Sequence, residues 1–209
     1  MVGREGTNYD TVSVVAGASD LEYGIGGWSL KGGSLLKLLD AYAKHPNAQF
    51  ASQIKGLVST GTASSSPELV SVLKQAGADP VMRQTQDDQF RTDVIEPSVS
   101  VVSGLGLHLP LSIAVFCDST LHICLNNTKK LADKATEKTG AAPATGGDEK
   151  AWTFNFMDAR TAYYKTLPIY NRFASAFDRR VDVFRRLAMD GDWMLTTTAA
   201  ETGANPAPN

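Results

Sequence analysis

Residues 109–124 read LPLSIAVFCDSTLHIC, and this stretch decides the fold class. A helix built from it is apolar on nearly every face, which is typical of a helix buried on most sides in a protein core. We therefore predict a long central helix that covers about residues 111–125. The apolar run Leu109–Val115 within it is far shorter than the roughly 20 residues that cross a bilayer, so we expect no membrane span.

Amphipathic patterns on both sides of this stretch predict further helices. Leu35, Leu38, Leu39 and Tyr42 recur with helical spacing behind Ser34, which is placed to cap them. Similar patterns and start signals predict helices over about 34–44, over 67–76, from 80 past Pro97, from about 152 to 163, and over about 171–189. The chain is thus predicted to be mainly helical both N-terminal and C-terminal to the central helix.

The first 33 residues have a different character, because they are rich in Gly, Ser, Thr and Val and contain a short β-prone run at 11–15. We predict a small sheet or hairpin within loops there. The tail 196–209 has no apolar period and is expected to be flexible. The sum is one mainly α-helical α+β domain over residues 1–195 with a small N-terminal β/loop region.

Charge and composition exclude several function classes. Lys and Arg total 20 against 22 Asp and Glu, for a formal charge of -2, which argues against a nucleic-acid partner and against stable membrane association. Three scattered histidines lack metal-ligand spacing, so no metal and no cofactor is expected. Cys117 and Cys124 would lie roughly 10 Å apart on one helix, and we interpret them as buried free thiols.

The acidic residues of the N-terminal region are the first candidates for chemistry. Glu5, Asp10, Asp20 and Glu22 lie within a Gly-rich stretch. Glycoside hydrolysis needs two carboxyl groups that flank a sugar, one to protonate the leaving oxygen and one to activate water or attack carbon. These residues permit such chemistry, but four acids in 22 residues are ordinary surface composition, so spacing alone favours a structural interpretation.

Ordered motifs give the chain a family resemblance from Glu5 to about Trp193. The blocks are 79–88 (DPVMRQTQDD), 94–99 (VIEPSV), 104–106 (GLG), 116–122 (FCDSTLH), 146–149 (GGDE) and 156–160 (FMDAR). In the same order, they resemble the F-x-Q-A-Q-x-D, D-P-A-V, G-L-G, Y-Y-D-A-x-V-M-H, G-G-D-E and F-L-D-A-R patterns of family 46 chitosanases. The short start before Glu5 and the run 158–165 (DARTAYYK) are similar to phage and bacterial peptidoglycan muramidases. Both belong to the lysozyme-like superfamily, so the resemblance implies two lobes around a cleft.

The resemblance also implies roles for the carboxylates. Glu5 would be the general acid, with a pKa raised by partial burial, and Asp20 the general base that positions water on the opposite face of the sugar. Glu22 stays open as the partner in place of Asp20, because the spacing around Asp20 departs from both relatives. Family 46 enzymes invert the anomeric centre, so a carboxyl separation that admits a water molecule is predicted.

Other residues have both a functional and a structural interpretation. Tyr23 and Trp28 could form a sugar-stacking platform, although Trp28 fits a core position equally well. Glu149 is a candidate for substrate contact beside Asp148, which also suits the cap of the following helix. Asp118 with Arg160 resembles the buried Asp–Arg network that supports the cleft in chitosanases.

Three functions follow from these patterns. The leading hypothesis is an endo-acting glycosidase that cleaves peptidoglycan strands by acid/base hydrolysis, similar to a phage endolysin. A chitosanase and a noncatalytic lysozyme-like binding module are the alternatives. The partner in each case is a polysaccharide, and we expect a monomer. The polar start (Gly3-Arg4-Glu5-Gly6) is no signal peptide, so we expect synthesis in a bacterial host cytoplasm and release to the cell wall, or a secreted form whose signal was removed.

Overall fold

A computed structural model describes residues 8–15, 20–59 and 66–196. The chain divides into two compact units, which we call the N-terminal unit (residues 3–93) and the C-terminal unit (from Val94 onward). Glu5 and the tail 197–209 lie outside the described residues, so the predictions for them stay predictions. The cleft between two lobes also stays a prediction.

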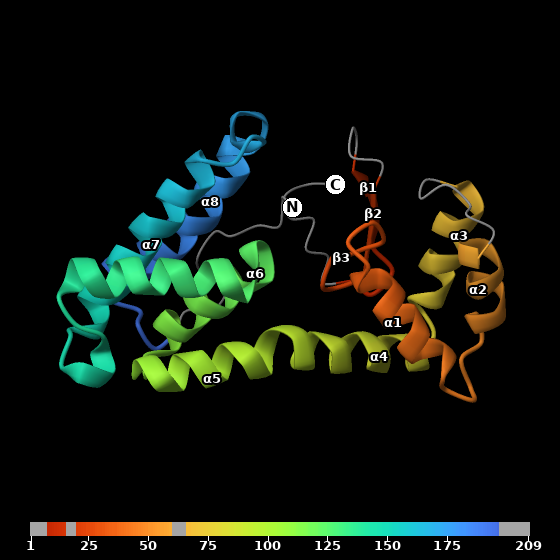
Figure 1. Cartoon of the computed structure of the whole chain (residues 1–209), viewed down its shortest axis with the longest axis horizontal. Helices are drawn as coiled ribbons and strands as arrows, with labels where there is room; N and C mark the ends of the chain where they lie inside the picture. The colour runs from red at the N-terminus through yellow and green to blue at the C-terminus, as the bar shows by residue number, and fades with distance from the viewer. Residues whose placement is uncertain (1–7, 16–19, 60–65, 197–209) are drawn as a thin grey trace. The chain divides into compact units, whose positions relative to one another are not determined.

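The N-terminal unit contains a small antiparallel sheet, as the sequence predicts. Its strands are β1 (Val12–Val15), β2 (Asp20–Tyr23) and β3 (Trp28–Ser29), in the order β1-β2-β3 (Figure 1). The register pairs Ser13 with Glu22 and Glu22 with Ser29, so these three residues form one row across the sheet. Leu21 and Tyr23 alternate with the acidic residues of β2 and are fully buried.

In the described part of this unit the sheet is followed by the helices α1 (Ser34–Ala43), α2 (Ala51–Ser59), α3 (Pro67–Ala76) and α4 (Pro80–Phe90). Helix α3 begins as predicted, because the Ser66 side chain accepts a hydrogen bond from Leu69 N. Asp79 caps α4 through Val81 N. Leucines of α1 and α3 form a common core with Leu21 and Tyr23 of the sheet. The sheet is thereby anchored on its buried face.

A π-helical turn, η1 (Arg91–Ile95), follows α4 and leads into α5 (Glu96–Leu105). Pro97 in α5 has no N–H to donate, and its ring would clash with the carbonyl four residues earlier, at Asp93. A widened turn immediately before the proline relieves that clash. Pro97 therefore interrupts the helical pattern without ending it, as the sequence predicts.

The C-terminal unit is built around the predicted central helix, α6 (Pro110–Thr139). Helix α7 (Glu149–Lys165) packs against both α6 and α8 (Tyr170–Met189), and a short 3-10 turn, η2 (Pro143–Thr145), precedes α7 (Figure 1). The rings of Phe116, Phe156 and Trp152 stack at the centre of this core. None of the helices in the described part of the chain is long and apolar enough to span a membrane.

Helix α6 differs from the prediction in two ways. It continues well past residue 125, because Thr128, Leu131, Ala132 and Ala135 provide a second buried stripe. It is also kinked at Cys124, which has a φ of 61° and a ψ of 157°. Cys124 is exposed at this kink and Cys117 is half-buried, so the prediction of two buried thiols is wrong.

Candidate active site

Strand β2 places Asp20 and Glu22 on one face of the sheet. Successive side chains of a strand point to opposite faces, so residues two apart share a face. The side chains of Asp20 and Glu22 are half-buried. Leu21, which lies between them, and Tyr23, which follows Glu22, point to the opposite face and are buried in the core. The structure thus brings together the two carboxyl groups that the sequence left as alternatives for the base.

The Asp20 carboxylate is held by three hydrogen bonds. Its Oδ1 atom accepts from the backbone N–H of Leu21 at 2.8 Å and from that of Lys31 at 2.9 Å. Its Oδ2 atom accepts from the Ser29 hydroxyl at 2.6 Å. All three donors favour the ionised form and fix the plane of the carboxylate.

The two carboxyl groups have pKa values that are shifted in opposite directions. Partial burial opposes ionisation of Asp20, but the hydrogen bonds from Ser29, Lys31 and Leu21 outweigh it and lower the pKa of Asp20. Burial raises the pKa of Glu22, and the neighbouring charge of Asp20 raises it further. Neighbouring acids whose environments separate their pKa values are typical of sites where one group gives and another takes a proton.

Gln86 connects the strand-bearing segment to helix α4. Its side chain is fully buried; its Oε1 accepts from Ile25 N at 3.1 Å and its Nε2 donates to the Tyr9 carbonyl at 2.8 Å. A Cβ atom at Gly24, which has a φ of +71°, would overlap the Gln86 amide. One buried amide therefore fixes both the turn after β2 and the segment that precedes β1.

The aromatic candidates for sugar stacking lie in the core. Tyr23 is 0% exposed and Trp28 is 6% exposed, and both pack among the leucines of α1 and α3. The Trp28 ring also lies against Gly26, where an added Cβ would overlap it. The prediction of a Tyr23–Trp28 platform is corrected accordingly, and the core interpretation of Trp28 is the one the structure supports.

Glu149 has a structural role in the C-terminal unit. Its Oε1 atom accepts hydrogen bonds at 2.9 Å from the backbone N–H groups of both His108 and Leu109, directly before α6. Asp148 caps α7 through Ala151 N at 2.7 Å. The Glu149 carboxylate thus satisfies two backbone donors in the segment that leads into α6. This geometry does not support the predicted substrate contact.

The predicted pair of Asp118 and Arg160 is part of a larger network. Arg160 is 0% exposed and its Nη2 lies 2.5 Å from Asp118 Oδ2, while Arg180 donates from Nε and Nη2 to Oδ1 at 3.0 and 2.6 Å. The ring of His122 lies 3.8 Å from the same carboxylate. Burial opposes ionisation of Asp118, but the charges of Arg160 and then Arg180 lower its pKa. Sequence reasoning missed Arg180, which lies 62 positions away.

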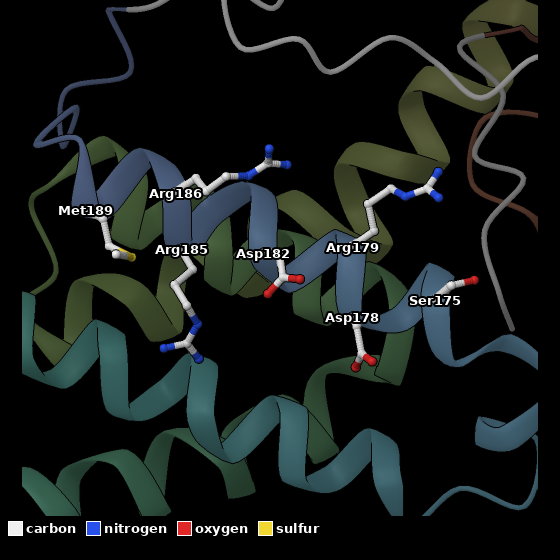
Figure 2. A pocket seen from close by; sticks show the side chains of 7 residues that line it. All are labelled: Ser175, Asp178, Arg179, Asp182, Arg185, Arg186 and Met189. Carbon is white, nitrogen blue, oxygen red and sulfur yellow. The ribbon is translucent and has the colours of Figure 1, made fainter.

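A charged hollow is lined by residues of α8, none of which is a predicted site residue. Figure 2 shows Arg179 and Arg186 pointing to one side and Arg185 and Asp178 to the other. Arg185 pairs with Asp158 at 2.9 Å, and Asp178 accepts from the Tyr170 hydroxyl. Aspartates and arginines are mixed in the lining, so this hollow does not define an anion or cation site. No cluster of three or more potential metal ligands occurs within residues 8–15, 20–59 and 66–196.

Comparison with known proteins identifies the class to which this fold and these carboxylates belong. Residues 5–198 match the model of glycosyl hydrolase family 46. The chain therefore belongs to glycosyl hydrolase family 46, and it is a glycosidase with the lysozyme-like α+β fold that the sequence motifs predict. No relative was found among curated proteins.

Solved structures of several chitosanases have a similar fold. The native chitosanase of Bacillus subtilis MY002 has a TM-score of 0.78 at 21% identity, with 92% of this chain and 85% of that chain covered. A glutamate-to-alanine mutant of that enzyme complexed with 6 GlcN has a TM-score of 0.76 at 22% identity, with 91% of this chain and 84% of that chain covered. The chitosanase of Gynuella sunshinyii in complex with chitotetraose has a TM-score of 0.78 at 19% identity, with 96% of this chain and 88% of that chain covered. At these identities the likeness shows the fold.

Proposed function

We propose that this protein is an endo-acting chitosanase, which hydrolyses β-1,4-linked glucosamine polymer. The observation that carries the proposal is the family 46 match over residues 5–198. Similar folds bound to chitotetraose and to 6 GlcN support the same substrate class. This reverses the ranking from the sequence motifs, which placed peptidoglycan first and chitosan second.

Asp20 is the proposed general base. A base must be ionised before the reaction and must hold a water molecule in one orientation. The lowered pKa of Asp20 meets the first condition, and its three hydrogen bonds meet the second by fixing the carboxylate plane. Glu22, whose pKa is raised, stays protonated to a higher pH than an ordinary glutamate and is the weaker candidate for this role.

Glu5 is the proposed general acid, on the motif resemblance alone. It would protonate the glycosidic oxygen while Asp20 takes a proton from the water that attacks the anomeric carbon from the opposite face. The C–O bond to the leaving sugar breaks as the bond to water oxygen forms, and the configuration inverts. The Asp20 proton then returns to solvent and Glu5 is reprotonated, which restores both groups.

Charge favours a cationic sugar at this face. Chitosan carries ammonium groups in mildly acidic solution, whereas peptidoglycan carries acidic stem peptides. The ionised Asp20 carboxylate on this face attracts the former and repels the latter. The electrostatics of β2 therefore support chitosan as the substrate.

Parallel assays on two polymers test the proposal. Reducing ends released from chitosan and from purified peptidoglycan would be measured with the wild type and with Glu5→Gln. We expect release from chitosan, a large loss in Glu5→Gln, and no release from peptidoglycan. Release of reducing ends from peptidoglycan alone would restore the muramidase hypothesis. Release from neither polymer, by a protein that circular dichroism shows to be folded, would favour a noncatalytic binding module.

A further inference from the structure

The turn that follows β3 wraps around one edge of the Asp20 carboxylate. Ser29 is 6% exposed, and its hydroxyl donates to Asp20 Oδ2 while it accepts from Gly32 N at 2.7 Å. Lys31 N in the same turn donates to Oδ1. Ser34 Oγ accepts from Ser29 N at 2.9 Å and so ties the turn to the start of α1. The Ser29 hydroxyl proton is thereby directed to Asp20, because its acceptor side is occupied by Gly32.

These bonds leave one direction of the carboxylate open. An ionised carboxylate has about four lone-pair positions, two on each oxygen. Among the described residues, Oδ1 accepts two hydrogen bonds and Oδ2 accepts one. The remaining acceptor position is on Oδ2, the same oxygen that Ser29 contacts. The Ser29 hydroxyl therefore occupies one of the two acceptor positions on Oδ2 and leaves the other as the remaining one.

We propose that Ser29 is the positioning residue of the general base, because it orients Asp20 so that a single acceptor position on Oδ2 faces the attacking water. This inference rests on the proposed function and adds a residue that the sequence motifs do not mark. A base that offers one acceptor position binds one water in one orientation. Such preorganisation lowers the cost of reaching the transition state rather than the cost of binding substrate.

Among the described residues, the charged groups that bear on Asp20 come from β2 and from the turn after β3. Glu22 lies on the same face of β2, and Lys31 lies in the turn after β3. Lys31 favours ionisation of Asp20, as do the hydrogen bonds, and the Ser29 hydroxyl gives the largest of the contributions that lower its pKa. Removal of the hydroxyl should therefore raise the pKa of Asp20.

The row across the sheet supplies a matched control. Ser13 on β1 and Ser29 on β3 both pair with Glu22, so both serines share the face that bears the carboxylates. The Ser13 hydroxyl is buried and forms no hydrogen bond among the described residues. Ser13→Ala removes a hydroxyl from the same row without touching Asp20.

The test compares Ser29→Ala, Ser13→Ala and the wild type on glucosamine oligomers as a function of pH. We expect Ser29→Ala to lower kcat about 10- to 100-fold with little change in KM, since a hydrogen bond to a charged group is lost. We also expect the acidic limb of kcat/KM to move to higher pH, in parallel with the Asp20 carboxyl pKa followed by carbon-13 NMR. Ser29→Thr, which keeps the hydroxyl, should restore the wild-type limb, and Ser13→Ala should resemble the wild type.

Two outcomes would overturn the inference. One is that the pKa of Asp20 in Ser29→Ala equals that in the wild type. The other is that the acidic limb of the kcat/KM pH profile shifts equally in Ser29→Ala and Ser13→Ala. If Ser29→Ala does not fold, Ser29→Cys replaces the hydroxyl by a weaker donor and must show the same direction of change. A wild type that is inactive on chitosan would defeat the proposed function instead, and the NMR titration would still decide whether Ser29 holds the carboxylate.

Discussion

Asp20→Asn is expected to lower kcat/KM on chitosan by about 10²- to 10⁴-fold, the range that a general base contributes. The amide is nearly isosteric and its oxygen can still accept from Leu21 N and Lys31 N, so the fold should persist. The amide cannot take a proton from water. Steady-state kinetics on glucosamine oligomers, with thermal unfolding as the check on folding, would measure the loss.

Glu22→Gln is the control for this prediction, because it removes the neighbouring carboxyl on the same face of β2. We expect a loss of less than about tenfold, since Glu22 is not the base in this mechanism. The Asp20 pKa should stay nearly unchanged, because Glu22 has the higher pKa and is already protonated when Asp20 titrates. A severe loss in Glu22→Gln together with a mild one in Asp20→Asn would transfer the role of base to Glu22.

Asp118→Ala is expected to lower the free energy of unfolding by about 3–5 kcal/mol, because it leaves two arginines without their shared carboxylate. Arg160 is fully buried and cannot reach water to compensate. Asp158→Ala is a suitable control in the same unit. That carboxylate pairs with Lys138 and Arg185 but is 45% exposed, so its loss should cost less than about 1 kcal/mol.

The difference between Asp118→Ala and the wild type should depend on pH. The folded-state pKa of Asp118 is lowered, so its contribution to stability is complete above the unfolded-state pKa and is lost as the pH falls through the folded-state pKa. Urea unfolding of both proteins at neutral and acidic pH would measure this. Equal differences at pH 7 and in strong acid would show that Asp118 acts through packing and not through its charge.

Local signals were sufficient for most of the helices. The bounds of α1 and α3 agree with the prediction nearly to the residue, because leucines recur at helical spacing in both. Ser66 caps α3 as predicted, but the predicted cap by Ser34 is wrong: Ser34 is the first residue of α1, the N-cap is Gly33, and the Ser34 hydroxyl accepts from Ser29 N instead. Helix α2 was missed, since Ile54 is its only residue classed as buried and no capping motif precedes it. The extent of α6 was underestimated because its second half has a polar composition and a sparse buried stripe.

The candidate site was predicted only in part, for a physical reason. The alternation of acidic and apolar residues in β2 is visible in the sequence, so Asp20 and Glu22 could be singled out. Ser29, Gln86 and Arg180 could not, because their partners lie up to 62 positions away and depend on tertiary contacts. Tyr23 was instead assigned a functional role that it does not have. An aromatic residue near the acids fits either a sugar-stacking platform or a core position, and only its complete burial in the structure distinguishes the two.

The stereochemistry of the product tests the central claim most directly. Proton NMR during the first turnovers on a glucosamine oligomer would show which anomer of the new reducing end forms first. An inverting family 46 enzyme with Asp20 as base must release the α-anomer from a β-linked substrate. Initial release of the β-anomer would contradict the account, because it would mean a covalent intermediate in which a carboxylate attacks the sugar. The absence of any cleavage of the oligomer would contradict it as well.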